Sequence, residues 1–457
     1  MNYELLFPAP GTAPVRYALT GANGGFARSL LMQTRAMPAL APVALCDLDP
    51  DGLRGTCTEL GYADAELITC TTPEEVRAAA AAGGIALVAD AALLAAAEID
   101  VLVEATGSPA HGFAMARDAL TRGVHVAMVS KEVDSVAGPY LNRLARTHGV
   151  VYTTADGDQP ANLIGLVTWA RVLGLEIVAA GKASEYDYVY DPASGTVAYT
   201  GRTVPGGGIG ALWELGGDVP GTLRARSAAL ASLPQSAVPD YCEMNVVCNS
   251  TGLVPARETL SYPLCRTTEL ADVFVPAEDG GILDRTGVVD VFNVLRRPDE
   301  ASFGGGVFVV VRAADASVWE TLRGKGHVVS RSGRYACLYL PYHLMGVETP
   351  MTLLSAVRHG RPSGAADQDV HAVMAVRTDR AFAAGETLTM GGHHHTIAGT
   401  TPLLRAAADA GPRTAPYYLA AGARLTGDVP AGTVLTLDHL DTDARSLRDA
   451  WLKGAAA

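Results

Sequence analysis

Cationic and aromatic side chains crowd one stretch of a chain that is otherwise acidic and poor in aromatics. The stretch Arg323–Glu348 reads RGKGHVVSRSGRYACLYLPYHLMGVE. Lysine and arginine can pair with a carboxylate or phosphate, and lysine, histidine or tyrosine can relay the proton of a hydroxyl group. We therefore predict that Lys325, His327 and Arg334 bind substrate or transfer protons. The alternative is a surface strand with alternating charges, followed by a helix that begins at Pro341.

Two further lysines follow apolar runs that are typical of buried strands. The run VHVAMVS leads into Lys131, and a strand predicted over residues 177–184 ends near Lys182. The carboxyl ends of parallel strands meet at one sheet edge, where ligands bind. An ammonium group at that edge can stabilise the negative charge that develops on a carbinol oxygen. The alternative for Lys131 is a solvated strand end.

Three carboxylates are candidate ligands for a divalent metal. Asp156 and Asp158 lie in the polar loop ADGDQPANLIG, and Glu348 closes the cationic stretch. Carboxylate oxygens suit hard divalent cations, but the separation of these residues in sequence does not show that they converge. The segment from Asp158 to Pro160 also has the composition of a helix N-cap. The sequence leaves the metal open.

A glycine turn near the start of the chain has the composition of a phosphate-binding loop. The segment 15–31 reads VRYALTGANGGFARSLL, an apolar run, a turn and a helical pattern. A first glycine permits the tight turn, a later one lets backbone approach a pyrophosphate, and the helix directs free N–H groups at the anion. The pattern is G-x-x-G-x-x-A, with Asn23 where the second glycine usually stands. The turn residues expected at a dinucleotide are Gly21, Asn23, Gly24, Gly25 and Phe26.

An acid ends the next predicted strand. The run VALCDLD places Asp47 at the strand tip, where a carboxylate accepts hydrogen bonds from both hydroxyls of the adenosine ribose and repels a 2′-phosphate. The nearest downstream arginine is Arg54. We therefore predict NAD as the cofactor, with NADP as the alternative.

Alternating strand and helix patterns surround these residues from Val15 to about Thr154. Short apolar runs alternate with alanine-rich helical stretches, which fits a mostly parallel sheet with helices on both faces, a doubly wound α/β domain. One run leads into Glu104-Ala-Thr-Gly107-Ser-Pro109, a second loop at the carboxyl edge. Further along, MNVVCNS, VVDVFNVL and GVFVVVRA read as strands of a second, mixed α+β domain.

The last segment contains an internal echo. Ala384-Gly385-Glu386-Thr387-Leu388 recurs as Ala431-Gly432-Thr433-Val434-Leu435, which predicts a small β-rich domain with two equivalent turns. The segment HGRPSGAADQD, residues 359–369, is predicted to link it to the rest of the chain.

Composition limits the remaining classes of function. The 457 residues suffice for two or three domains, and a formal charge of −13 disfavours nucleic acid as a partner. No apolar run is long enough to span a membrane, and the start of the chain lacks the pattern of a signal peptide. The seven cysteines form no C-x-x-C pair, so we expect buried, reduced thiols and a cytoplasmic protein.

Several of these motifs occur together in one known family. TGANGGFA, VEATGSP, VSKEVD, the GDQP loop, GKGHVVSRSGRY and YHLMGVETP resemble the predicted homoserine dehydrogenases that carry a C-terminal SAF domain, and the two A-G-x-x-L turns resemble that SAF module, a β-clip. The resemblance covers essentially the whole chain. It implies a Rossmann domain over 1–155, a catalytic α+β domain over 156–368 and a SAF-like domain over 369–457.

The resemblance also implies a reaction. Thr106 and Gly107 would line the nicotinamide side, Lys131 would lie beside the nicotinamide, and Lys182 would contact substrate or transfer a proton. One branch of the family resembles 1-deoxy-D-xylulose 5-phosphate reductoisomerase and uses NADPH, whereas another acts as oxidoisomerases on branched sugar acids such as apionate with NAD.

The function expected from these motifs is an oxidoreductase acting on a small polyol, sugar acid or sugar phosphate. A coupled rearrangement is expected, with the reductoisomerase and a homoserine dehydrogenase as alternatives. A non-catalytic nucleotide or carbohydrate sensor is the alternative outside enzymes. A homo-oligomer is expected by analogy.

Overall fold

The computed structural model describes residues 2–7, 13–313, 315–392 and 394–456. Its contacts divide the chain into two compact units. Unit 1 comprises residues 1–161, 344–369 and 442–457, and unit 2 comprises residues 162–343 and 370–441. The chain therefore returns to unit 1 twice, rather than passing through three consecutive segments. The three-domain division made from the sequence stays a prediction.

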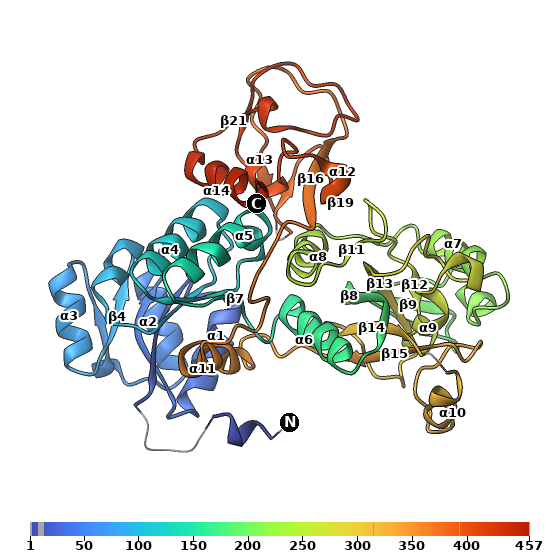
Figure 1. Ribbon diagram of the computed structural model, residues 1–457, viewed down its shortest axis with the longest axis horizontal. Helices are drawn as coiled ribbons and strands as arrows, with labels where there is room; N and C mark the ends of the chain where they lie inside the picture. The colour runs from blue at the N-terminus through green and yellow to red at the C-terminus, as the bar shows by residue number, and fades with distance from the viewer. Residues whose placement is uncertain (1, 8–12, 314, 393, 457) are drawn as a thin grey trace. The chain divides into compact units, whose positions relative to one another are not determined.

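Unit 1 contains a seven-stranded sheet in the order β3-β4-β2-β1-β5-β6-β7, and every pairing in it is parallel (Figure 1). All seven strands coincide with apolar runs, as the alternating pattern predicts. In chain order they are β1 (Val15–Thr20), β2 (Leu40–Cys46), β3 (Leu67–Thr69), β4 (Ile85–Val88), β5 (Val101–Glu104), β6 (His125–Met128) and β7 (Tyr152–Thr154). The order reverses between β1 and β5, the position where parallel sheets bind ligands.

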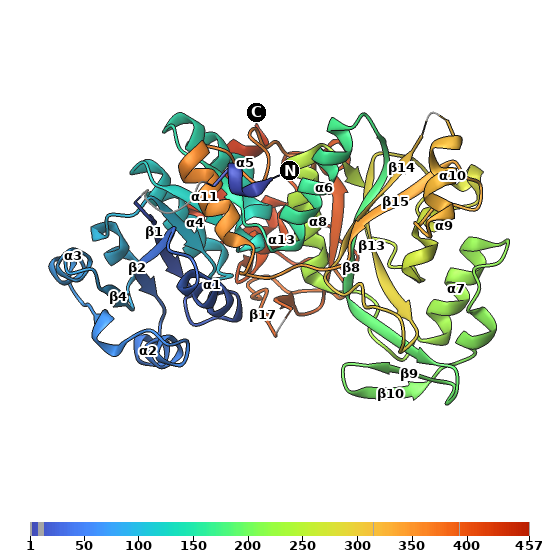
Figure 2. The same ribbon diagram turned by 90° about the horizontal axis from the view of Figure 1, so that it is seen from below.

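Helices cover both faces of this sheet (Figures 1 and 2). α4 (Pro109–Thr121), α5 (Lys131–Thr147) and α14 (Arg445–Ala455) pack together, and α1 (Gly25–Arg35) packs against α11 (Thr349–His359). α2 (Pro50–Glu59) and α3 (Pro73–Ala81) complete the set that connects the strands. Because both faces are covered, the strands are buried almost throughout, including β1 at Tyr17 and Leu19.

Unit 2 is built on a mixed sheet. β13 (Val288–Arg296) runs parallel to β8 (Glu176–Asp191), and β14 (Val307–Arg312) runs antiparallel to β8 and to β15 (Tyr335–Leu340). β9 (Thr196–Tyr199) and β10 (Arg202–Pro205) form a hairpin that pairs with the end of β8 (Figure 2). The short strands β11 (Val254–Pro255) and β12 (Leu264–Cys265) pair with β13. The mixed sheet agrees with the α+β pattern of the sequence.

Helices cover both faces of this sheet as well (Figure 1). α8 (Val238–Thr251) packs on β13, and α7 (Val219–Ala229), α9 (Leu270–Val273) and α10 (Ser317–Gly324) belong to the remaining connections. The prediction of a strand at MNVVCNS was wrong, because these residues lie inside α8. Pro239 stands in the first turn of α8 and Gly252, with φ +74°, ends it, so the helix boundaries outweigh the short run of strand-forming residues.

Residues 370–441 belong to unit 2 and contain the two repeated turns. β16 (Ala372–Thr378) and β19 (Thr400–Ala406) form an antiparallel pair. Gly385 and Gly432 both have φ near +80°, and the amide of each donates to a carbonyl, of Leu425 and Thr378 respectively. The two turns are therefore alike in backbone conformation, as the sequence echo predicts.

The segment 359–369 packs on unit 1, and the chain passes to unit 2 directly after it. The Ser363 hydroxyl donates to Asp156, and the amide of Gly364 donates to the hydroxyl of Thr153 at 2.9 Å. All seven cysteines are buried and none forms a disulfide, which confirms the expectation for the thiols. Within the described parts of the chain, no helix combines the length and apolar character that a membrane span requires.

Candidate functional site

The glycine turn connects β1 to α1 and is fixed by backbone sterics. Gly21 has φ +63°, and a Cβ at this position would lie 2.4 Å from the carbonyl oxygen of Ala105 on the neighbouring loop. Only glycine satisfies both constraints. Gly24 is the N-cap of α1, and its amide donates to Gly21 at 3.0 Å. The turn therefore has the tight form that the sequence predicts.

Asp47 holds the other side of this turn. One carboxylate oxygen accepts the amide of Asn23 at 3.0 Å, and the second accepts the amide of Asp49 at 3.2 Å. The Asn23 side chain accepts the hydroxyl of Thr56 at 2.7 Å. Each Asp47 oxygen keeps a further lone pair for a ligand hydroxyl. The structure thus brings together Asn23, at the position where the motif departs from its usual glycine, and the acid at the second strand tip.

The start of α1 faces open space. A Cβ placed on Gly25 would meet no atom within 4 Å, and Phe26 is half-buried. The first amides of a helix have no partner within the helix and lie at its positive end, so those of Gly25 and Phe26 are suited to an anion. The packing of unit 1 places no demand on Gly25, which leaves close approach of a ligand as a reason for glycine there.

A buried acid organises the second loop at this edge. Glu104 ends β5 and is completely buried. Its carboxylate accepts the amide of Thr106 at 3.0 Å, while the amide of Gly107 donates to the hydroxyl of Ser130 at 2.8 Å. Burial raises the pKa of Glu104, and hydrogen bonds from Ser130 and Thr106 oppose that shift. Glu104 therefore fixes Thr106 and Gly107, which the sequence predicted at the cofactor, although its own role was not predicted.

Lys131 is the first residue of α5, three residues beyond the end of β6 at Met128. Its ammonium nitrogen lies 3.2 Å from a carboxylate oxygen of Asp158, and the two side chains are 26% and 11% exposed. A second oxygen of Asp158 accepts the amide of Gln159 at 3.0 Å. Asp158 therefore fixes a cation in a partly shielded position, where it interacts with charge more strongly than it would in water.

The three candidate metal ligands have separate partners. Asp156 accepts the hydroxyls of Thr352 at 2.7 Å and Ser363 at 2.5 Å, and Glu348 accepts the amide of Leu344 at 3.1 Å. Burial raises the pKa of Asp156, against the effect of the two hydroxyl donors. Among the described residues, no group of three or more histidine, cysteine, aspartate or glutamate side chains has the arrangement of a metal site.

Lys182 lies in a fully buried charged cluster of unit 2. Its ammonium group pairs with Asp240 at 2.7 Å and with Glu243, both on α8, and its side chain is 1% exposed. Burial by itself lowers the pKa of Lys182, but the attraction of the two carboxylates raises it above its usual value. Lys182 is therefore a fixed cation. Its two partners were not predicted, because they lie about 60 positions away in sequence, just before the run MNVVCNS that was read as a strand.

A strained loop contacts the same cluster. Leu260 and Tyr262 both have φ +45°, a conformation that costs a non-glycine residue about 1–3 kcal/mol. The Tyr262 hydroxyl lies 3.0 Å from Asp240, and the amide of Ser261 donates to Asp290 of β13 at 2.7 Å. Asp290 is completely buried, and burial raises its pKa. Such strain persists only where its surroundings enforce it, and it often marks functional sites.

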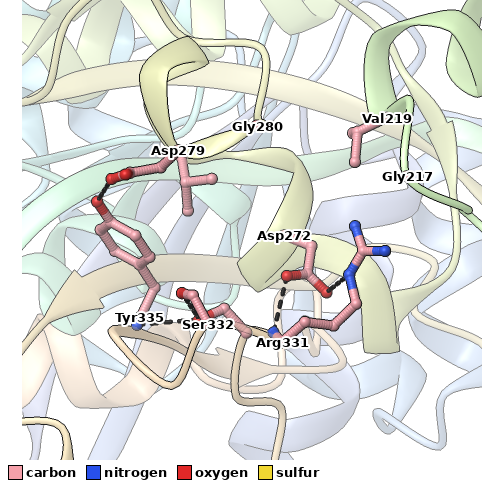
Figure 3. A pocket seen from close by; sticks show the side chains of 10 residues that line it. Gly217, Val219, Asp272, Asp279, Gly280, Arg331, Ser332 and Tyr335 are labelled. Atoms are coloured by element: carbon pink, nitrogen blue, oxygen red, sulfur yellow. Dashed lines mark hydrogen bonds and ion pairs between the residues drawn. The ribbon is translucent and has the colours of Figure 1, made fainter.

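The remaining predicted residues do not join this cluster. Lys325 caps the C-terminus of α10, and both Lys325 and His327 are exposed. Arg334 pairs with Asp279, which also accepts the hydroxyl of Tyr335. Tyr335 and Asp279 line a pocket of about 320 Å³ (Figure 3). Its other lining residues are Gly217, Val219, Asp272, Val275, Gly280, Ser330, Arg331 and Ser332.

Lys182 and this pocket lie on opposite faces of the unit 2 sheet. Alternate residues of a strand point to opposite faces. Ala183 packs in the apolar cluster that includes Val275 and Tyr335 of the pocket wall, whereas its neighbour Lys182 points to α8. Figure 1 shows α8 and α9 on opposite sides of this sheet. Arg334 and Lys182 therefore cannot serve one site within unit 2.

An ion pair joins two residues of the pocket wall. Arg331 pairs with Asp272 at 3.2 Å, and the Arg331 amide donates to the same carboxylate at 2.9 Å (Figure 3). Hydrogen bonds from Tyr335 and Arg334 lower the pKa of Asp279. Two cations of the stretch singled out from the sequence, Arg331 and Arg334, are thus paired with acids from other segments.

One segment of the chain matches a family model. Residues 236–349 match the model described as "Oxidoreductase DRL, catalytic domain". The match spans less than half of the chain and includes Asp240, Glu243, Tyr262 and Asp290. No curated protein matches the sequence.

Several solved structures are similar at low identity. A UDP-N-acetylglucosamine 3-dehydrogenase from Acidithiobacillus ferrooxidans is 13% identical, over 78% of this chain and 93% of that chain, with a TM-score of 0.37. A hyperthermophilic archaeal homoserine dehydrogenase in complex with NADPH is 13% identical, over 75% and 97%, with a TM-score of 0.38. An oxidoreductase from Agrobacterium radiobacter in complex with NAD+, L-tartaric acid and magnesium is 18% identical, over 38% of this chain and 46% of that chain, with a TM-score of 0.28.

Proposed function

We propose that the protein is an NAD-dependent oxidoreductase that acts on a small polyhydroxylated substrate, a sugar acid or sugar phosphate. The observation that carries the proposal is the Asp47-braced glycine turn, which lies at the point where the order of a seven-stranded parallel sheet reverses. The match of residues 236–349 to an oxidoreductase catalytic domain supports the same class.

The preference for NAD follows from the charges around Asp47. An adenosine ribose bound there would donate its two hydroxyls to the carboxylate, whereas a 2′-phosphate would meet its negative charge. Arg54 is the candidate cation for such a phosphate, but it pairs with Asp64 at 2.7 Å and donates to Thr69 at 3.1 Å. Using Arg54 for NADP would break both contacts.

The chain's own residues would bind, orient and stabilise charge. When bound, a nicotinamide supplies a hydride acceptor or donor. Thr106 and Gly107, held by Glu104 and Ser130, would line its binding site, and Lys131 would stabilise the negative charge that develops on the substrate oxygen. Asp158 keeps the ammonium group of Lys131 in place. Lys182 is the second candidate for the same task, with its charge maintained by Asp240 and Glu243.

A coupled rearrangement of the carbon skeleton is the narrower form of the proposal, as in an apionate oxidoisomerase. Two neighbouring oxygens must then be held together, a role that a divalent metal or lysines can fill. A reductoisomerase acting on deoxyxylulose phosphate and a homoserine dehydrogenase are the alternatives within the class. The SAF-like identity of residues 369–457, a homo-oligomer and a cytoplasmic location stay predictions.

The test is turnover by the purified protein. NAD and NADP would be added with apionate, tetronic acids, homoserine and deoxyxylulose phosphate, and nicotinamide absorbance would be followed at 340 nm, as is usual for these cofactors. We expect NAD-linked turnover of a sugar acid. Cofactor binding without turnover of any substrate would favour the non-catalytic sensor.

A further inference from the structure

The buried cluster around Lys182 holds more acid than base. Three carboxyl groups, Asp240, Glu243 and Asp290, and one ammonium group lie within unit 2 with at most 4% of each residue exposed. A buried carboxylate without a compensating partner is costly, so the protonation of these groups depends on the hydrogen bonds that each receives. Asp240 forms an ion pair with the ammonium group of Lys182 and accepts a hydrogen bond from the hydroxyl of Tyr262.

Tyr262 has a strained backbone, and hydrogen bonds of Ser261 and of its own hydroxyl fix its position. Its backbone has φ +45°, and so does that of Leu260, while the intervening Ser261 is tied to Asp290 through its amide. The Tyr262 hydroxyl lies 3.0 Å from Asp240 and 3.1 Å from the carbonyl of Ala237, the N-cap of α8. A hydroxyl has one proton, so it donates to one of these oxygens at a time. The strained backbone of Tyr262 thus occurs together with a contact between its hydroxyl and Asp240, the acid that pairs with Lys182.

We propose that Tyr262 is a positioning residue, which through Asp240 keeps Lys182 charged and oriented for the reaction. The inference rests on the proposed function, because it assumes that Lys182 stabilises charge on the substrate. Donation to Asp240 favours the ionised carboxylate, and the ionised carboxylate favours the ammonium form of Lys182. Without the hydroxyl, Asp240 binds a proton more readily and its hold on Lys182 weakens.

Few other groups act on Asp240. The charged and titratable groups that face it are Lys182 and Tyr186 from β8, Tyr241 and Glu243 from α8 and Tyr262 from the loop. Asp240 and Asp290 raise the pKa of Tyr241, and Arg377 from β16 lowers it, after the larger effect of burial. A change confined to the Tyr262 hydroxyl therefore alters one of a small number of interactions.

The chain offers a matched control. Tyr241 lies beside Tyr262, with ring centroids 6.3 Å apart, and its hydroxyl donates to the carbonyl of Thr259 at 2.9 Å. Tyr241→Phe removes a hydroxyl of α8 that donates to the loop and makes no hydrogen bond to Asp240, whereas Tyr262→Phe removes the hydroxyl that donates to Asp240. Both changes cost one hydrogen bond, and only one of them changes the proton affinity of the acid.

The first measurement does not depend on turnover. Urea unfolding of the full chain between pH 5 and pH 9, typical limits for such a series, gives the stability difference between each variant and the wild type. Tyr262→Phe raises the folded-state pKa of Asp240, so its stability deficit should grow as pH rises through that pKa. The deficit of Tyr241→Phe should be independent of pH. Equal behaviour of the two variants would overturn the inference.

The second measurement is the pH profile of kcat. The acid limb should move upward by about half a pH unit or more in Tyr262→Phe, with KM and NADH affinity nearly unchanged and with no shift in Tyr241→Phe. If the stability deficit of Tyr262→Phe grows with pH but its pH profile of kcat does not move, Tyr262 has only a structural role. That result would overturn the inference. If the wild type turns over no substrate while the stability deficit grows with pH, the proposed function fails, and with it the catalytic part of this inference, although the charge coupling stands.

Discussion

Individual residues carry the charges on which the proposed chemistry depends. Lys131 and Lys182 were predicted from positions at the ends of strands, and the structure shows both paired with carboxylates. The strand end predicted near Lys182 was wrong, because β8 continues to Asp191 and Lys182 lies inside it. Their partners could not be predicted, because ion pairing depends on distances between segments that are remote in sequence. Lys325 and His327 were singled out from the composition of their segment, but in the structure both side chains are exposed.

Lys131→Met tests the role of that cation. It should lower kcat by about 100-fold or more, since removal of one group that stabilises developing charge typically costs that much. The affinity for NADH, measured by calorimetry, should stay nearly unchanged, because the glycine turn proposed to hold the dinucleotide is braced by Asp47 and not by Lys131's partner Asp158. Retained turnover would remove Lys131 from the mechanism.

The buried carboxyl group of Asp134 should make the free energy of unfolding depend on pH. It is completely buried, and burial raises its pKa to about 6, against hydrogen bonds from Tyr152 and Gln368. Because the folded pKa lies above the unfolded value of 3.8, its stabilising contribution is complete below pH 3.8 and is lost as pH rises to about 6. The loss amounts to about 3 kcal/mol at most.

Asp134→Asn should remove this contribution to the pH dependence. The amide stays neutral, so the variant should gain stability relative to the wild type between pH 4 and pH 7, as measured by urea unfolding. A constant difference across that range would show that Asp134 is not protonated in the folded protein.

Elements were predictable where a pattern is long and repeated. All seven strands of the unit 1 sheet were confirmed, because parallel strands buried on both faces are nearly continuous apolar runs. The strand predicted at MNVVCNS failed because seven residues of β-like composition cannot be separated from a buried helix by periodicity alone. The strained backbone at Leu260 and Tyr262 has no sequence signal, since it is imposed by the surrounding fold.

The turn between β1 and α1 allows packing to be separated from binding. Gly21→Ala should destabilise unit 1 by more than about 2 kcal/mol, because it adds a clash with Ala105 and strains the backbone. Gly25→Ala should leave thermal stability nearly unchanged, because a Cβ there meets no atom within 4 Å. It should nevertheless weaken NADH binding if a pyrophosphate lies against α1. Equal losses of stability in the two variants would contradict this account of the turn.

At the scale of the whole molecule, the local sequence pattern indicates the strands and helices of a unit, but it does not indicate which remote segments complete that unit. The alternating pattern up to Thr154 corresponds to the sheet of unit 1, but the return of residues 344–369 and 442–457 to that unit has no local signal. Such returns depend on contacts such as Ser363 with Asp156, which join segments about 200 positions apart.

The thiols provide a test of the chain as a whole. All seven cysteines are buried, and burial raises the pKa of Cys57 to about 11 and that of Cys46 to about 12. A disulfide reagent such as Ellman's should therefore react only slowly with the native protein. In denaturant it should react readily with all seven thiols. Rapid reaction of several thiols under native conditions would show that the described packing opens in solution.

The most direct test of the central claim is calorimetric titration of the purified protein with NADH and NADPH. The account predicts that NADH binds at least about tenfold more tightly than NADPH, and that Asp47→Ala removes this preference, because the carboxylate both binds the ribose and repels the 2′-phosphate. Failure to bind either dinucleotide, or a tenfold preference for NADPH, would contradict it.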